Sequence, residues 1–142
     1  MKQITLYSEG TALGNPASGG YATILLYNTK ERILSGRESR TTNNRMELLA
    51  VIQGLSALKE PCEVEVISSA SYVCKGINTW LENWRKRDFI KVKNLDLWQE
   101  YLKVSEQHSI VATLLKERSF HAENERCHTM ANAEAEKFKT AL

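Results

Sequence analysis

The stretch TTNNRMELLAVIQGLSALKE, from Thr41 to Glu60, is where the hydrophobic pattern of the chain changes from a strand period to a helix period. Its apolar residues recur at the spacing of one helix face, at Leu48, Val51, Ile52, Leu55 and Leu58. Thr42 or Asn43 can cap its N-terminus, and Pro61 stops the pattern. The stretch therefore predicts a helix that connects strands before it to a strand after it, as in an α/β protein.

The residues before Thr41 have the patterns of strands. Apolar and polar residues alternate over Gln3–Ser8, which predicts the first strand. Gly10–Gly20 is rich in Gly, Asn and Pro, so we expect a turn-rich loop there. Tyr21–Ser39 then predicts a hairpin with Asn28–Glu31 as its connection.

The residues after Glu60 continue with alternating strands and helices. Strands are predicted at Glu63–Ser68 and Ser109–Lys116, and helices at Tyr72–Trp84, Asn94–Gln107 and Glu123–Leu142. This order predicts a five-stranded mixed sheet flanked by helices, antiparallel over its first three strands and parallel after them. No repeat or linker interrupts the pattern, so we expect a single domain over residues 1–142.

The composition is that of an ordinary globular protein. Of the 142 residues, 42% are hydrophobic and 25% are charged, and no apolar run reaches the roughly 18 residues that span a bilayer. Cys62, Cys74 and Cys127 are an odd number of cysteines without a C-x-x-C pair. This favours reduced thiols in the cytoplasm over a disulfide framework, and we expect no membrane association.

Basic residues are concentrated in one stretch, although the net charge is only +2. WRKRDFIKVK, from Trp84 to Lys93, holds five basic side chains against the single acid Asp88. The basic residues are Arg85, Lys86, Arg87, Lys91 and Lys93. The run is typical of a surface that contacts nucleic-acid phosphates, and the alternative is a merely solvated face.

Four polar residues are predicted to meet at one edge of the sheet. Glu9 follows the first strand, Ser69 follows the fourth, Glu47 lies in the first turn of the first helix, and His128 lies near the start of the last helix. Sites in such sheets form at the carboxyl ends of the central strands. The topology therefore predicts that these side chains share one rim.

Several stretches resemble the type 1 ribonuclease H family, most closely its bacterial form. They are GNP at Gly14–Pro16, GGYA at Gly19–Ala22, TTNNRMEL at Thr41–Leu48, CEV, YV, NTWLENWRKRDF, KVKNLDLW and HAENERC. The resemblance implies a ribonuclease H-like fold and an endonuclease that cuts the RNA strand of an RNA/DNA hybrid with two Mg²⁺ ions. It also implies a basic handle, at roughly residues 79–98, that holds the DNA strand.

The resemblance implies four metal-binding carboxylates and a loop histidine, and most of these are changed here. The catalytic positions of the family carry Glu9, Glu47, Ser69, His128 and Arg118. Only Glu47 is unchanged, because the family has aspartate at the first, third and fourth carboxylate positions and histidine where Arg118 stands. An adjacent alignment would instead bring His121 to the loop position.

The changed residues predict an inactive or severely impaired enzyme. Glu9 and Glu47, the remaining metal ligands, supply a charge of −2 where two divalent ions carry +4, so Mg²⁺ binding is expected to be weak or lost. One alternative is an active ribonuclease H that uses Glu9 and Glu47 with Mn²⁺ or another unconventional metal site. His128 has three interpretations: a surface imidazole without a role, a third ligand beside the two glutamates, or a phosphate contact.

The hybrid-binding residues are largely retained. By resemblance, the nucleic-acid contacts are Asn15, Thr42, Asn43, Asn44, Trp80, Trp84, Arg85, Lys86, Arg87, Lys91 and Lys93. An alternative for the tryptophans, including Trp98, is that they form the core of the handle. We therefore expect a monomeric protein that still binds RNA/DNA hybrids, and the remaining alternative is an interaction module that keeps only the scaffold.

Overall fold

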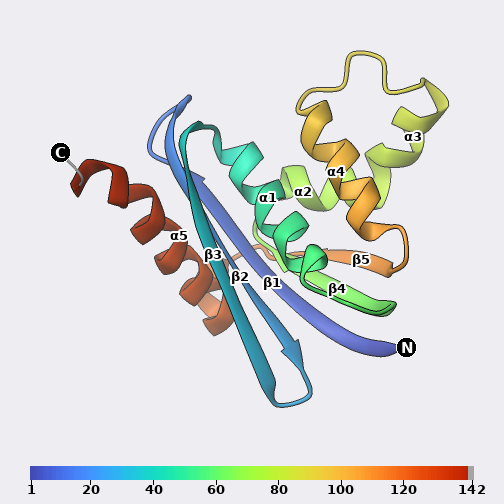
Figure 1. Cartoon of the computed structure of the whole chain (residues 1–142), viewed down its shortest axis with the longest axis horizontal. Coiled ribbons are helices and arrows are strands. Elements are labelled where there is room, and N and C mark those ends of the chain that lie inside the picture. Colours follow the sequence, from blue (N-terminus) through green and yellow to red (C-terminus); the bar gives the residue numbers. More distant parts are fainter. Residues whose placement is uncertain (141–142) are drawn as a thin grey trace.

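The computed structural model describes residues 1–140, and a five-stranded sheet runs through its centre (Figure 1). The strands lie in the order β3-β2-β1-β4-β5. They are β1 (Lys2–Ala12), β2 (Ala17–Tyr27), β3 (Lys30–Thr41), β4 (Cys62–Ser68) and β5 (Ser109–Leu114). β1 to β3 pair antiparallel, whereas β4 pairs parallel with both β1 and β5. The predicted mixed sheet is therefore confirmed.

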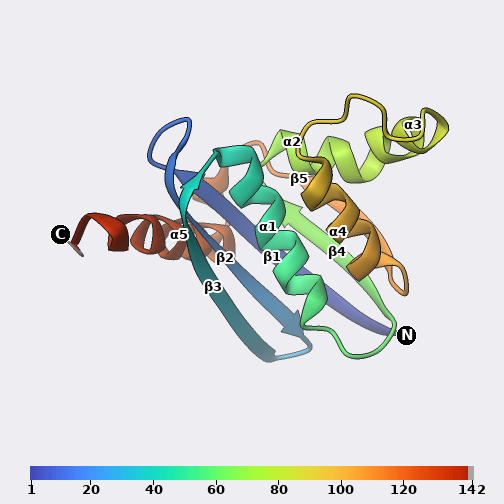
Figure 2. The ribbon, with the colours of Figure 1, turned by 45° about the horizontal axis from the view of Figure 1, so that its top comes forward.

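Helices cover both faces of this sheet, as the two views show (Figures 1 and 2). They are α1 (Asn43–Ser56), α2 (Ser71–Lys75), the π-helix η1 (Gly76–Trp80), α3 (Leu81–Lys86), α4 (Leu95–Ser105), the 3₁₀-helix η2 (Arg118–Phe120) and α5 (Ala122–Thr140). α5 packs on one face against β1, β2 and β3, while α1 packs on the other face. The last two residues of the predicted C-terminal helix, 141 and 142, lie outside the described residues.

The loop predicted over Gly10–Gly20 is wrong, because most of those residues belong to strands. Only residues 13–16 connect β1 to β2. Gly19 and Gly20 are buried in β2, and a Cβ on Gly20 would collide with the Ala131 carbonyl of α5. These glycines permit the close approach of a helix to the sheet rather than a turn.

The predicted hairpin connection over Asn28–Glu31 is too long. Only Asn28 and Thr29 lie between β2 and β3, and Asn28 has the positive φ of 55° that a two-residue hairpin turn demands. Lys30 already pairs with Tyr27, and Glu31 pairs with Leu26. The polar sequence looked like a loop, but β3 is an exposed edge strand and its side chains face water.

The start of α1 was predicted correctly, and its end was not. Thr42 is the N-cap, and its hydroxyl accepts a hydrogen bond from the Arg45 amide at 3.3 Å. The helix ends at Ser56, well before Pro61. Gly54 in its last turn is buried against Leu6, so the helix here is held by packing on β1.

The core is divided by the sheet into two clusters. The larger one joins α1, β4 and α4, and its fully buried members include Leu6, Leu48, Val66 and Trp98. The smaller one lies beneath α5 and contains Ala22, Ile24 and Cys127. Side chains alternate between the two faces of the sheet along β1, and this explains why the core is divided into two clusters. Even-numbered residues such as Leu6 face α1, while odd-numbered residues such as Tyr7 face α5.

The predicted handle, at roughly residues 79–98, runs from the end of η1 through α3 and the following loop to the start of α4, and it has aromatic packing of its own. Trp98 of α4 is completely buried, and its ring centroid lies 5.2 Å from that of Trp84. Trp80 and Trp84 are half-buried, with centroids 5.9 Å apart. Trp98 is therefore a core residue, and the other two tryptophans combine packing with an accessible face.

Within the described residues, no helix is long and apolar enough to cross a membrane. Cys62, Cys74 and Cys127 are all free and buried. Burial raises the pKa of the Cys74 thiol to about 11 and that of Cys127 to about 12, and the negative charge of Glu9 adds to both shifts. These thiols are therefore protonated at neutral pH.

Gly76 provides a test of the handle core. A Cβ at this position would overlap the ring of Trp98, which is fully buried and has no space to move into. We expect Gly76→Ala to lower the free energy of unfolding by about 1–3 kcal/mol through overpacking, measured by urea denaturation. The control is Gly14→Ala in the exposed β1–β2 loop, where we expect a change below about 0.5 kcal/mol. Equal urea concentrations at the unfolding midpoints of the two variants would contradict the described packing of Gly76 against Trp98.

Candidate functional site

Glu9 lies inside β1 and not after it, which corrects the sequence prediction. It pairs with Ala22 of β2, and β1 continues beyond it to Ala12. β4, on the other side of β1, ends at Ser68, so Glu9 is the first residue of β1 that has passed the end of its parallel neighbour. Its carboxylate therefore faces the backbone that leaves β4, although the side chain is only 4% exposed.

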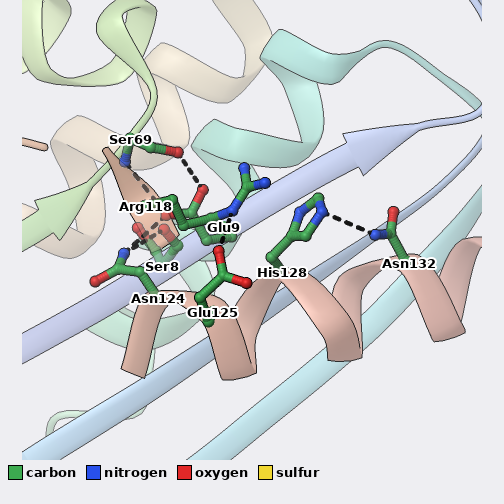
Figure 3. A network of polar contacts seen from close by, with 8 residues as sticks. All are labelled: Ser8, Glu9, Ser69, Arg118, Asn124, Glu125, His128 and Asn132. Carbon is green, nitrogen blue, oxygen red and sulfur yellow. Dashed lines mark hydrogen bonds and ion pairs between the residues drawn. The ribbon is translucent and has the colours of Figure 1, made fainter. Parts of the chain in front are cut away.

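Three hydrogen bonds hold the Glu9 carboxylate (Figure 3). The Ser69 hydroxyl donates to Oε1 at 2.6 Å, and the Ser69 amide donates to Oε2 at 3.2 Å. The Asn124 side chain donates to Oε2 at 2.8 Å from α5. Both oxygens are thus engaged by neutral donors from two other elements, which compensates the buried negative charge.

Asn124 is a central residue of this network, and the sequence interpretation did not single it out. It is completely buried in the first turn of α5, and its Nδ2 atom also reaches the Ile67 carbonyl of β4 at 3.0 Å. Its Oδ1 atom is buried and has no hydrogen-bond partner among the described residues. The available signal was an amide three residues before the buried Cys127, on the inward face of the helix.

Glu47 lies in the second turn of α1, one turn later than predicted. Burial raises the pKa of its carboxyl group to about 7, and the nearby charge of Glu9 adds to the shift. Because Glu47 lies beyond the first turn of α1, the helix dipole stabilises its ionised form less than it would at a first-turn position. Glu47 is a carboxylate whose ionisation is disfavoured by its surroundings.

Arg118 and His128 lie in the neighbourhood of Glu9 (Figure 3) but interact with other residues. The Arg118 side chain, at the start of η2, donates to Glu125 of α5 at 2.9 Å. His128, in the second turn of α5, has its Nε2 atom 3.0 Å from Nδ2 of Asn132 (Figure 3). Because an amide nitrogen only donates, Nε2 is the acceptor of this contact in the orientation that the Asn132 side chain takes. His121 is exposed.

Residues 1–140 contain no group of three or more His, Cys, Asp or Glu side chains that could hold a metal ion. The interpretation of His128 as a third ligand beside Glu9 and Glu47 is therefore not supported by the geometry. Ser69, which was predicted to stand at the third carboxylate position, donates a hydrogen bond to Glu9 and adds no charge.

The amide side chains predicted to contact nucleic acid gather at the start of α1. Asn15 in the β1–β2 loop, Asn43 and Asn44 are all exposed. The Asn43 Oδ1 atom accepts a hydrogen bond from the Ala12 amide at 2.6 Å, which ties the start of α1 to the end of β1. Thr42 caps the same helix. Figure 2 shows the β1–β2 loop, which holds Asn15, and the start of α1, which holds the other three residues, at the same end of the sheet.

The five predicted basic residues of the handle, Arg85, Lys86, Arg87, Lys91 and Lys93, are all exposed. No ion pair engages any of them in the described part of the chain. Their loop contains non-glycine residues with left-handed φ at Asp88, Phe89 and Lys91, a strained conformation that the sequence did not predict. The basic residues are therefore available to a polyanion.

The sequence is similar to that of known proteins over nearly its whole length. Residues 1–136 match the family model described as RNase H. Ribonuclease HI of Helicobacter pylori strain J99 is 53% identical over 137 residues, which cover 96% of each chain. Ribonuclease H of Campylobacter concisus is 55% identical over 139 residues, covering 98% of this chain and 96% of its own.

Solved structures share the fold. LC9-RNase H1, a type 1 RNase H with the type 2 active-site motif, has a TM-score of 0.86 and 24% identity, over 95% of this chain and 72% of its own. LC11-RNase H1 in complex with an RNA/DNA hybrid has a TM-score of 0.65 and 21% identity, over 94% of this chain and 97% of its own. At these identities the similarity establishes the architecture.

The buried charge of Glu47 predicts a pH-dependent stability. Its pKa is about 7 in the folded protein, above the ordinary value of 4.5 that applies to the unfolded chain. The stabilising effect of its protonation is therefore complete below about pH 4.5 and is lost as the pH rises through 7. We expect Glu47→Gln to stabilise the protein by about 1–3 kcal/mol at pH 8 and by much less at pH 5, measured by thermal melts in a buffer with EDTA.

The matched control is Glu106→Gln, which makes the same charge change at an exposed residue. This variant should change the melting temperature little at either pH. A Glu47→Gln shift that is equal at pH 5 and pH 8 would show that burial does not penalise the ionised carboxylate.

Proposed function

The chain belongs to the ribonuclease H family, and we propose that its catalytic centre is inactive or severely impaired while the protein still binds RNA/DNA hybrids. One observation carries this proposal: the residue that follows β4, Ser69, donates a hydrogen bond to Glu9 where the family pattern has a metal-binding carboxylate. The catalytic positions in the proposal are Glu9, Glu47, Ser69, Arg118 and His128.

The set of oxygen donors is poorly suited to two Mg²⁺ ions. Mg²⁺ requires several hard oxygen ligands in octahedral geometry, and a two-metal centre places carboxylates around and between the ions. Here Glu9 and Glu47 contribute at most −2, since the pKa of Glu47 is raised to about 7, and both oxygens of Glu9 already accept hydrogen bonds. We therefore propose that Mg²⁺ binding is weak or lost and derive no catalytic step through it.

The hydrogen bonds to Glu9 support a pocket that is stable without a cation. In a pocket that lacks compensating donors, a metal ion relieves the repulsion between neighbouring carboxylates. Ser69 and Asn124 supply three donors to Glu9, so part of this compensation is internal to the protein. An ion bound at Oε1 would share that oxygen with the Ser69 hydroxyl, whose 2.6 Å hydrogen bond already draws on its negative charge.

The same substitutions make the cleft more favourable to a phosphate backbone. Neither Ser69 nor His128 carries a carboxylate, so two negative charges of the family pattern are absent. Arg118 is balanced by Glu125 and stands at the same rim (Figure 3). Lower negative charge in the cleft reduces the repulsion of the phosphates of a bound strand.

Two exposed surfaces support hybrid binding. One is the amide-rich start of α1 with Asn15, Thr42, Asn43 and Asn44, and the other is the basic handle with Trp80, Trp84, Arg85, Lys86, Arg87, Lys91 and Lys93. Recognition of a hybrid by groove shape and 2′-hydroxyl contacts needs no catalytic metal. The fold is shared with LC11-RNase H1, which was solved in complex with an RNA/DNA hybrid.

The proposal also covers the cellular compartment and the oligomeric state of the protein. Three buried free thiols, Cys62, Cys74 and Cys127, are compatible with a reducing compartment, and we place the protein in the cytoplasm as a single-domain monomer. The competing functions are an active enzyme that uses Glu9 and Glu47 with Mn²⁺, and a scaffold without nucleic-acid affinity.

A single assay separates these three functions. The protein is incubated with a labelled RNA/DNA hybrid in Mg²⁺, in Mn²⁺ and in EDTA, and cleavage and gel retardation are scored separately. We expect retardation under all three conditions and no cleavage at a rate ordinary for the family. Cleavage in Mn²⁺ alone would favour the unconventional metal site, and the absence of retardation would favour the scaffold.

The control variant for binding is Lys91→Gln with Lys93→Gln. Both side chains are exposed and unpaired in the described structure, so their loss should leave the fold intact. We expect weaker retardation and a salt dependence of the binding constant that is less steep by about one for each lost phosphate contact. An unchanged salt dependence would exclude the handle from the interface.

Restoring the family residues should restore cleavage. The variant combines Glu9→Asp, Ser69→Asp, Arg118→His and His128→Asp. With Glu47, which is unchanged, the cleft then holds four carboxylates in total. We expect its hybrid cleavage rate in Mg²⁺ to exceed that of the original chain by several orders of magnitude, because the two ions regain their ligands.

The control for this experiment carries only Glu9→Asp and Arg118→His, so that Ser69 and His128 remain. It leaves the number of carboxylates at two and should stay inactive. If the fourfold variant folds and binds hybrid but does not cleave it, the defect lies outside these positions.

A further inference from the structure

Arg45 of α1 makes a two-pronged ion pair with Asp96 of α4. Its Nη1 atom lies 2.9 Å from Oδ1, and its Nη2 atom lies 2.7 Å from Oδ2. Nη1 also donates to the Asn94 side chain at 3.3 Å. The hydrogen bond to Arg45 lowers the pKa of Asp96, so the pair stays ionised well below neutral pH. The geometry is directional and fixes the relative orientation of two helices.

The contact continues into the aromatic core of the handle. The Asn94 side chain donates to the Tyr72 hydroxyl at 3.1 Å, and the Trp98 indole donates to the same hydroxyl at 2.9 Å. The Tyr72 ring lies 5.8 Å from that of Trp80 and 5.9 Å from that of Trp98. A continuous chain of contacts therefore leads from α1 to the helices that carry the basic residues.

The two ends of this chain of contacts adjoin the two parts of the proposed binding surface. Arg45 directly follows Asn44 on α1, and its own amide hydrogen-bonds to the N-cap Thr42. Asp96 stands three residues after Lys93, the last basic residue of the handle. The amide-rich start of α1 and the basic loop are thus joined at one ion pair.

We propose that the Arg45–Asp96 ion pair is a positioning device that holds the basic handle at a fixed distance from the start of α1, so that one hybrid is gripped at both places. The inference rests on the proposed hybrid binding and deepens it. Arg45 and Asp96 act through other residues, so they are positioning residues.

The physical advantage is that of two linked binding sites. When two contact surfaces are held in register, the second contact forms at a high effective concentration, and this advantage falls when their separation fluctuates. The handle loop has four non-glycine residues of left-handed backbone, at 88, 89, 91 and 94, and its Phe89 and Val92 side chains are only partly buried against the core. The tie to α1 therefore adds a directional restraint to this partial packing.

Asp96→Asn distinguishes positioning from direct electrostatics. This substitution removes a negative charge, so if only charge mattered, the variant would bind the polyanion as tightly as the original chain or more tightly. If the ion pair positions the handle, binding weakens in spite of the more favourable charge. The Asp96 side chain is 65% exposed, and the substitution is therefore expected to leave the fold intact.

The experiment has two readouts on the full chain. Amide hydrogen exchange of residues 81–93 is compared between the original chain and Asp96→Asn without nucleic acid, and hybrid affinity is measured against salt concentration in EDTA. We expect exchange in the handle to become at least about tenfold faster. We also expect affinity to fall by about tenfold, with a less steep salt dependence because fewer handle contacts form at once.

A second ion pair supplies the matched control. Arg126 of α5 reaches both oxygens of Glu31 on β3 at 3.2 and 2.9 Å, away from the proposed binding surface. Glu31→Gln makes the same charge change as Asp96→Asn and should leave both readouts unchanged. Asp96→Glu keeps the carboxylate, so its hybrid affinity should be close to that of the original chain and well above that of Asp96→Asn. If residue 96 mattered only through its backbone, the two variants would bind hybrid equally well.

Each outcome decides the inference. Unchanged exchange in Asp96→Asn overturns it, because the handle is then held by other contacts. Faster exchange with unchanged affinity also overturns it, because positioning would not matter for binding. If the original chain does not bind hybrid at all, the proposed function fails, and the hydrogen-exchange result alone then decides whether the ion pair holds the handle.

Discussion

A carboxylate buried in a protein must be hydrogen-bonded or neutralised, and the cleft of this protein is organised around that requirement at Glu9. The register of the sheet carries β1 past the end of β4, so the Glu9 side chain meets the backbone and hydroxyl of Ser69. α5 completes the arrangement by placing Asn124 on the opposite side of the carboxylate. Three elements that are far apart in the sequence are therefore joined at one buried charge.

Glu47 has the opposite environment, and the contrast between the two glutamates is informative. Glu9 is 4% exposed, and its charge is stabilised by three donors, whereas burial and the neighbouring negative charge raise the pKa of Glu47 to about 7. A residue that destabilises the fold at neutral pH is typical of functional sites. In the ribonuclease H family, such a carboxylate would ordinarily be compensated by metal ions. With the proposed weak or absent metal binding, the negative charge of Glu47 is left uncompensated.

The proposed binding surface consists of exposed amide and basic groups, whereas the cleft is built around buried carboxylates. Its amide residues at the start of α1 and its basic residues on the handle are exposed, and exposed charges act through their number and spacing. Their spacing is set by buried or paired groups, namely the aromatic core around Trp98 and the ion pair between Arg45 and Asp96. The proposed loss of catalysis would therefore not remove the scaffold on which the proposed hybrid binding rests.

The sequence alone determined the element order, the mixed five-stranded sheet and the Thr42 cap, because these follow from local periodicity and local hydrogen bonding. Family resemblance also predicted the catalytic positions Glu9, Glu47, Ser69, Arg118 and His128, and this assignment stays a prediction. Only the tertiary structure decided that Gly20 belongs to a strand, that Asn124 bonds to Glu9, and that Arg45 ties α1 to the handle. These features arise from contacts between residues distant in the chain, which side-chain burial and strand register create and which no local pattern encodes.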